Sequence, residues 1–292
     1  MTAVVGILNK QAVAIAADSA VTIGGATNHK IFNKANKVFT LSKQHPVGIM
    51  IYNSASFMGT PWETIIKVYR KQLGQTSFPT VRGYQTDFLE FLRKKKFYTS
   101  NEIQSKYFEY FTEFVLRSAI DGVIQKYPNL LNDPTPQNKE LFIQQLDHEV
   151  ENLIAIWNRS TDYCPEFGDY TFDMFDVYVK DVFAQLIQSY FLQNGIDLSD
   201  ALQLKLKQAV FAILRSKEEI TDYTGLIFTG FGDDEIYPQL VPVIISMAVD
   251  NRLRYYIDEK QSASITIEQN GAVRPFAQTD VIDTILSGID PR

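Results

Sequence analysis

The chain has 292 residues, of which 45% are hydrophobic and 21% charged, a composition typical of a folded globular protein rather than a disordered one. Its 34 acidic and 28 basic residues give a net charge of −6, which argues against nucleic acid and against an anionic membrane surface as partners. The longest apolar run, 240–249, is too short to cross a membrane, no signal-peptide pattern is present, and the single cysteine excludes an internal disulfide, so we expect a cytoplasmic protein.

Residues 1–60 have the pattern of β-strands. Short runs rich in β-branched and apolar residues predict strands at 4–8, 12–17, 38–41 and 48–51. The first two runs are almost continuously apolar, which is typical of strands covered on both faces. We therefore expect the N-terminal strands to belong to a sandwiched sheet.

Residues 61–220 change to a helical period, and we expect six helices of differing length there. Thr135 before Pro136 predicts a helix start, and Asn194 with Gly195 predicts the end of a helix that covers 173–193. Two sets of apolar residues at spacings of four and three are predicted to line one helix face each: Ile103, Tyr107, Phe111 and Phe114, and Leu146, Val150, Leu153 and Trp157. The aromatic stripes of this zone are interpreted as packing between helices rather than as a ligand groove: Tyr107, Tyr110, Phe111, Phe114, Phe175, Phe183, Tyr190 and Phe191.

Residues 221–292 return to strands, predicted at 225–229, 242–246 and 253–257, and end in a short helix. The glycines of Gly230–Glu235 suggest a phosphate loop, but such a loop should open a helix, and here a strand resumes. We therefore predict a turn between two strands. A chain of this length is expected to form one large domain with an insertion, or two domains.

Metal, cofactor and cysteine chemistry have little support in the sequence. His29, His45 and His148 lie far apart and have no cysteines at ligand spacing, so no metal site is predicted. No Gly-x-Ser-x-Gly nucleophile motif is present. Cys164 has acidic neighbours, which would raise the pKa of its thiol, and it is predicted to be inert. We expect no cofactor.

The N-terminus carries the strongest chemical signal. Removal of Met1 would make Thr2 the first residue, so that its hydroxyl could attack a carbonyl while its own α-amine takes the proton. A nearby lysine ammonium would lower the pKa of that amine by like-charge repulsion, and an aspartate would hold the lysine in place. Asp18 ends the second predicted strand, and a hairpin would return it beside the start of the first.

The opening of the chain resembles that of proteasome β-subunits and of the proteolytic subunit of the related bacterial two-component protease. The resemblance rests on Thr2-Ala-Val-Val-Gly-Ile and on Ala16-Ala17-Asp18-Ser19-Ala20-Val21-Thr22-Ile23-Gly24, with sixteen residues from Thr2 to Asp18. The segment 36–41 is similar to the family's next strand, whose leading lysine is the catalytic partner, and 48–61 is similar to the fourth strand and the start of the first helix.

This resemblance implies an α+β fold: the N-terminal-nucleophile (Ntn) hydrolase αββα sandwich, with residues 1–60 and 221–292 forming the sandwich and 61–220 a large all-helical insertion. It implies that Thr2 is nucleophile and base, that Asp18 orients the lysine, and that Thr22 holds peptide substrate by main-chain contacts. The strand motif assigns the lysine to Lys37, and an ungapped count assigns it to Lys34. We prefer Lys37, because loops accept insertions more readily than strands accept register slips.

The chain also departs from the family pattern. Ala20 replaces a usual arginine, and the glycine pair of the oxyanion hole falls near Tyr52-Asn53-Ser54, which makes Asn53 a candidate for substrate binding. Residues 277–280 resemble the region of a supporting serine, but the family's later bracing Asp and Ser have no counterpart.

Two functional hypotheses follow from the sequence. The first is a threonine peptidase or amidohydrolase that acts on peptides or unfolded protein as a ring-forming homo-oligomer, with an ATP-dependent unfoldase as a partner. The second is a catalytically inactive, proteasome-like assembly or binding module that uses its helical insertion to contact a partner.

Overall fold

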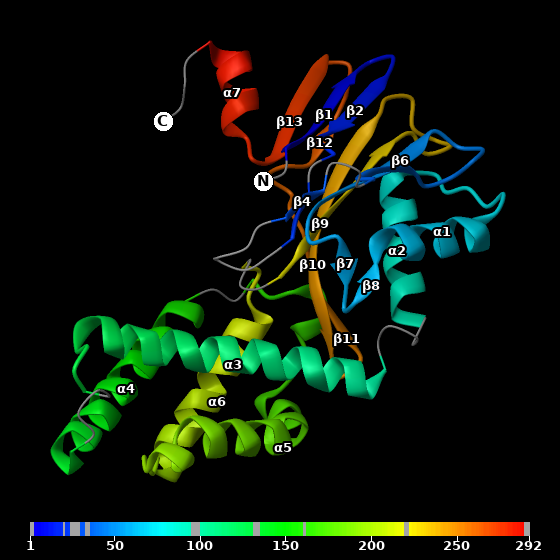
Figure 1. The fold of residues 1–292 in the computed structure, drawn as a ribbon. Coiled ribbons are helices and arrows are strands. Elements are labelled where there is room, and N and C mark those ends of the chain that lie inside the picture. Colours follow the sequence, from blue (N-terminus) through cyan, green and yellow to red (C-terminus); the bar gives the residue numbers. More distant parts are fainter. Residues whose placement is uncertain are drawn as a thin grey trace. The chain divides into compact units, whose positions relative to one another are not determined.

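The computed structural model describes residues 3–19, 21–23, 30–32, 36–94, 100–130, 135–159, 162–218 and 222–288 (Figure 1). It is a mixed α/β protein with antiparallel sheets. The N-terminal zone contains eight described strands: β1 (Ala3–Asn9), β2 (Val13–Ala17), β3 (Val21–Ile23), β4 (Lys30–Phe32), β5 (Val38–Thr40), β6 (Val47–Asn53), β7 (Ser56–Phe57) and β8 (Thr60–Pro61).

The helices and the returning strands follow in the order that the sequence predicts. The described α-helices between 61 and 220 number six, which confirms that prediction: α1 (Trp62–Leu73), α2 (Val81–Lys94), α3 (Asn101–Lys126), α4 (Pro136–Trp157), α5 (Phe172–Tyr190) and α6 (Asp200–Arg215). Short 3₁₀ turns lie at Pro165–Phe167 (η1) and Leu192–Asn194 (η2). The last zone contains β9 (Thr224–Gly230), β10 (Gln239–Val249), β11 (Arg252–Ile257), β12 (Ala263–Ser264), β13 (Gly271–Ala277) and α7 (Asp280–Ser287).

Residue contacts divide the chain into two compact units. The first, here called the sheet unit, comprises residues 1–98, 222–246 and 256–292; the second, the helical unit, comprises 99–221 and 247–255. The expected helical zone 61–220 is therefore shared, because α1 and α2 belong to the sheet unit and α3–α6 to the helical unit.

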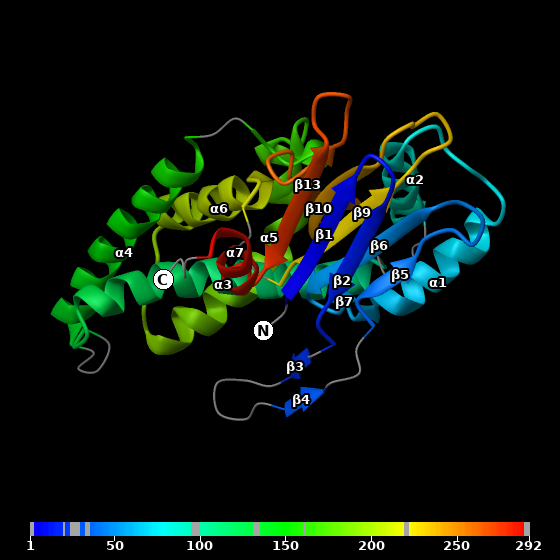
Figure 2. The same cartoon turned by 90° about the horizontal axis from the view of Figure 1, so that it is seen from above.

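The sheet unit contains two antiparallel sheets packed face to face (Figure 2). One has the order β13-β1-β2, and the other has the order β11-β10-β9-β6-β5 with β12 paired to β10. The hydrophobic core between them draws on both sheets and includes Val4, Leu8, Met50, Tyr52, Ile227, Leu240, Ile244 and Phe276. Gly6 permits this close packing, because a Cβ added there would lie 2.4 Å from Cδ1 of Leu240.

Helices α1 and α2 cover the other face of the larger sheet. The ring of Phe88 on α2 meets that of Phe228 on β9 at a centroid distance of 5.5 Å. Trp62 opens α1 fully buried, and its indole N–H donates to the hydroxyl of Thr224 at 2.8 Å. A buried hydrogen bond of this kind fixes the helix against the strand that follows the whole helical zone in sequence.

One prediction about the N-terminal strands was wrong. β1 does not have both faces covered: Val4 and Leu8 are buried, whereas Ile7 is 46% exposed. In β2 the outward positions Ala14 and Ala16 are exposed. Alanine and valine are apolar enough to give a continuous run in the sequence, but strand alternation still sends every second side chain to the outer face.

The helical unit is built from Ser/Thr-capped helices around aromatic rings. The side chains of Ser100, Thr135, Thr171 and Ser199 accept the first free N–H groups of α3, α4, α5 and α6. The start predicted at Thr135–Pro136 is confirmed, with Thr135 accepting from the N–H of Asn138. The predicted end at Asn194–Gly195 is shifted: α5 ends at Tyr190, and Gly195, with φ +66°, ends η2 instead.

The predicted buried face of α3 was wrong in register. Phe111 is buried as expected, but Phe114 is 44% exposed, and Phe108 and Val115 lie in the core in place of Ile103 and Tyr107. α3 is apolar on several sides, so residue spacing alone allowed more than one stripe. On α4 the expected face is largely confirmed, with Leu146 and Val150 buried.

The glycine-rich segment after β9 is a turn, as predicted. β9 and β10 pair antiparallel with Gly230 opposite Gln239. The carboxylate of Glu235 closes the turn by accepting the N–H groups of Gly232 and Val81. In the described part of the chain no helix is long and apolar enough to cross a membrane.

Candidate active site

Asp18 is placed by the first hairpin. β1 and β2 pair with Val4 opposite Ala17, so Asp18 is the first residue after the hairpin's second strand. Its N–H donates to the carbonyl of Ala3 at 3.0 Å. Asp18 therefore lies beside Ala3, the first residue of β1, as the sequence predicts. Ala3 directly follows Thr2 in the sequence.

Lys37 comes to Asp18 from the other sheet. It directly precedes β5, and its carbonyl accepts the N–H of Ile51 on β6 at 2.8 Å. Its Nζ lies 2.7 Å from Oδ1 of Asp18. The Lys37 side chain is only 6% exposed and that of Asp18 is 36% exposed.

The pair is unusual for its burial. Lysine is almost never buried unless its charge is compensated. An ammonium taken out of water needs a close counter-charge, and the carboxylate of Asp18 at 2.7 Å supplies one. Replacing a buried ion pair by well-packed apolar side chains is often neutral or stabilising, so the pair is weak evidence for a stabilising role.

Small residues allow the two sheets to come this close. A Cβ added to Gly48 on β6 would lie 3.1 Å from Cδ1 of Ile15 on β2, the strand that ends just before Asp18. Close approach of β2 and β6 is what brings the carboxylate of one sheet within reach of the ammonium of the other.

Asn53, the predicted oxyanion-region residue, has a backbone that glycine would favour. Its φ is +66°, and asparagine is among the few residues that tolerate this conformation. Ser54 donates its N–H toward β9, to the carbonyl of Tyr223, whereas Ile51 donates toward the β5 edge, to Lys37. Because N–H groups alternate between the edges of a strand, the N–H of Asn53 is directed to the β5 edge, as is that of Ile51.

The other predicted site residues fall wholly or partly outside the described part of the chain. Thr2, Ala20 and Lys34 lie outside it. Thr22 lies in β3 opposite Ile31, and its side chain is outside the described part.

The sequence did not predict the strand that covers the other edge of β1. β13 pairs with β1 so that Ala277 lies opposite Ala3, and Ala277 has φ +62°. Pro275 within this segment argues against a strand, but β13 is an edge strand, where the missing N–H can face outward. The turn into α7 therefore starts opposite the first described residue of β1.

The structure also bears on the predictions about metal binding and about Cys164. Among the described residues no group of three or more His, Cys, Asp or Glu side chains could hold a metal ion. Cys164 is fully buried and donates to the carbonyl of Ser216 at 3.2 Å. Burial is the main cause that raises the pKa of its thiol; the cations of Arg254 and Lys217 oppose it, and the acidic neighbour Asp162 raises it further, as expected.

The Lys37–Asp18 pair places a lysine ammonium where it can act on neighbouring groups. It fixes the Lys37 ammonium beside the start of β1, where an ammonium would favour the neutral form of a neighbouring amine and stabilise a developing negative charge on oxygen. No protein-family model, curated protein or solved structure matches this chain significantly. The functional assignment therefore rests on the chain's own pattern and geometry.

Proposed function

We propose that this protein is a threonine-type Ntn hydrolase that cleaves peptide amide bonds, on a proteasome-like αββα sandwich. The observation that carries the proposal is the ion pair between the buried Lys37 and the partly exposed Asp18, with Nζ 2.7 Å from Oδ1, next to the first residues of β1. Two residue types that the chemistry of an N-terminal threonine requires are thus brought together from separate sheets.

The proposed reaction begins after Met1 has been removed. The hydroxyl oxygen of Thr2 attacks the substrate carbonyl, and the α-amine of Thr2 takes the hydroxyl proton. The same proton then passes to the leaving amine as the C–N bond breaks, leaving an ester on Thr2 that water hydrolyses. Lys37, held by Asp18, keeps the amine neutral and stabilises charge on oxygen; the N–H of Asn53 is the proposed oxyanion donor.

The stacked antiparallel sheets, with α1 and α2 on one outer face, support the two inner layers of the proposed sandwich and one of its two helical layers. By the same resemblance we propose a peptide or unfolded-protein substrate, with Thr22 on β3 holding its main chain. A ring-forming homo-oligomer, an ATP-dependent unfoldase partner and a cytoplasmic location complete the proposal.

The proposal is tested first by mass and covalent labelling. Intact-mass measurement of active protein should find Met1 absent, and an electrophilic threonine-protease inhibitor should add its mass to the peptide that starts at Thr2. Thr2→Ala should abolish both labelling and amide hydrolysis. Thr2→Ser is the matched control, because it keeps a hydroxyl and an α-amine and should keep measurable activity. Activity in protein that retains Met1 would overturn the mechanism, because the base would be blocked.

A non-catalytic assembly or binding module is the second candidate. The observation in its favour is that α3–α6 form a compact unit with its own core, more than a small hydrolase needs. Removal of Met1 without labelling of Thr2 by any electrophile, and without hydrolysis of any peptide tested, would favour this candidate.

A further inference from the structure

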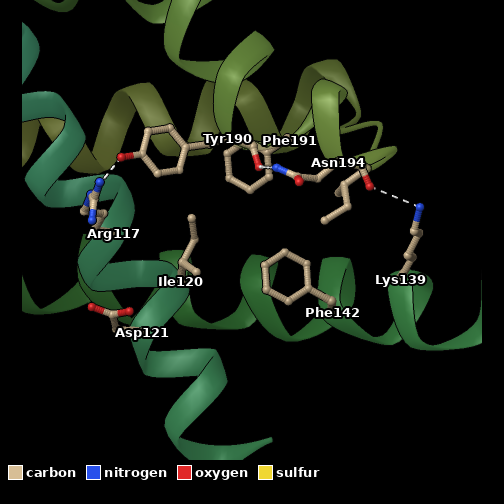
Figure 3. Close-up of a pocket in the computed structure, with 9 residues that line it drawn as sticks. Arg117, Ile120, Asp121, Lys139, Phe142, Tyr190, Phe191 and Asn194 are labelled. Carbon is tan, nitrogen blue, oxygen red and sulfur yellow. Dashed lines mark hydrogen bonds between the residues drawn. The ribbon is translucent and has the colours of Figure 1, made fainter. Parts of the chain in front are cut away.

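The helical unit contains a cavity of about 400 Å³ that the proposed hydrolase chemistry does not use (Figure 3). It is formed by α3, α4 and the segment from the end of α5 to Ile196. A volume of this size is within the range of small-molecule sites, which are about 300–1,000 Å³. The cavity lies entirely in one compact unit, so its shape does not depend on the sheet unit.

The middle of the cavity is apolar. Figure 3 shows Ile120 and the ring of Phe142 on one side and Phe191 on the other, and Ile196 also contributes to the wall. Phe142, Phe191 and Ile196 are buried, with 1%, 1% and 4% exposure. These side chains are therefore held by the core and leave a fixed apolar slot rather than a collapsible surface.

The two ends of the cavity differ in charge. At one end, Arg117 is already neutralised, because it donates to Glu113 and to the hydroxyl of Tyr190. Asp121 adds a second carboxylate at that end, so this end is net negative. The opposite end is formed by Lys139 and Asn194 (Figure 3).

Lys139 is suited to bind an anion. Its ammonium donates to the carbonyls of Asn194 and Gly195, both at 3.1 Å, and among the described residues no carboxylate lies within ion-pair distance of it. An ammonium has three donors, so a third remains for a ligand. Lys139 also lies in the first turns of α4, which starts at Pro136, where the helix dipole favours negative charge.

We propose that this cavity binds a small apolar carboxylate, with the carboxylate on Lys139 and the apolar body between Phe142 and Phe191. The sign of the charge at each end sets the direction: the anion goes to Lys139 and away from Asp121. This inference stands apart from the proposed hydrolase, because it involves neither Thr2 nor Lys37. The carboxylate could be that of a free acid or the C-terminus of a short apolar peptide.

The test is calorimetric titration of the full-length protein with matched probes. Octanoate and 3-phenylpropionate should bind, and octan-1-ol and octylamine should bind at least tenfold more weakly, because the alcohol carries no negative charge to pair with the Lys139 ammonium and the amine is itself a cation at neutral pH. N-acetyl-leucyl-phenylalanine and its C-terminal amide separate the two sources. Tight binding of the peptide acid alone assigns the site to peptide C-termini, and tight binding of octanoate or 3-phenylpropionate alone assigns it to free acids.

Variants connect the binding to the cavity. Lys139→Met should weaken carboxylate binding about tenfold or more, and Lys180→Met, an exposed lysine on α5, should leave it unchanged. Lys139→Arg keeps the positive charge and should retain most of the affinity for carboxylates. Thermal melts of all variants check that each is folded. Equal binding of acid and alcohol, no binding of any probe at millimolar concentration, or unchanged affinity in Lys139→Met would each overturn the proposal.

Discussion

The two units of this protein differ in how far the basic side chains of their ion pairs are buried. In the sheet unit, Lys37 is 6% exposed and pairs with a carboxylate across two sheets. In the helical unit, the described ion pairs sit at the surface; the most sheltered basic partner among them, Arg252, is still 21% exposed and its partner Asp169 is 79% exposed. The buried Arg254 donates to the carbonyls of Leu214 and Ser216 at the C-terminal end of α6.

This difference bears on the roles that charged residues have in the two units. Surface ion pairs contribute little to stability, and Arg254 satisfies carbonyl groups at a helix end. Lys37 makes its ion pair across two sheets, and replacing a buried ion pair by well-packed apolar residues is often neutral or stabilising. The contrast between the units therefore singles out the region in which we propose that charge serves the reaction.

The largest expected effect is on Lys37. Lys37→Met keeps the volume and removes the charge, and we expect at least a 100-fold loss of peptide hydrolysis, because the amine of Thr2 and the developing oxyanion lose their cation. Initial rates with a fluorogenic peptide measure the effect. The exposed Lys43→Met is the control and should keep full activity. A Lys37→Met protein that is folded and fully active would contradict the proposed role of Lys37, and with it the functional contrast between the two units.

A smaller effect, on stability alone, tests the aromatic core of the helical unit. Phe108 is fully buried and its ring lies 6.0 Å from that of Phe175, so Phe108→Ala should cost about 3–5 kcal/mol of unfolding free energy. Phe114 lies on the same helix but is 44% exposed. Phe114→Ala should therefore lower the unfolding free energy by less than about 1 kcal/mol. Urea unfolding followed by circular dichroism compares them. Similar losses in both variants would contradict the helix orientation described above.

The smallest effect concerns a surface ion pair. The pKa of Glu113 is lowered chiefly by the hydrogen bond from Tyr190 and also by Arg117, with burial opposing. A lowered pKa in the folded state stabilises the protein above the unfolded carboxyl pKa, about 4.3, and this stabilisation is lost as the pH falls through the folded value.

Glu113→Gln should therefore cost less than about 1 kcal/mol at pH 7, and the difference from the wild type should shrink below about pH 4. Thermal melts across this pH range measure it, with the exposed Glu109→Gln as control. A loss at pH 7 as large as that of Phe108→Ala would show that surface charge, not ring packing, holds the helical unit together.

Much of the local structure was predictable because its causes are local. The cap at Thr135, the turn after Gly230 and the position of Asp18 at the end of a hairpin depend on residues a few positions apart. The register of α3 and the open outer face of β1 were not predictable, because apolar spacing allows several faces and only the neighbouring elements select one. The strand β13 was hidden by Pro275, whose tolerance depends on its edge position.

The sequence by itself determined the residue types of the candidate site: a threonine near the start of the chain, an aspartate sixteen residues later and a choice of two lysines. Only the tertiary structure brought Lys37 to Asp18, because the contact joins two sheets whose packing depends on Gly6, Gly48 and a core drawn from both ends of the chain. Such a contact has no local signature, since its geometry comes from the burial of distant apolar strands against one another.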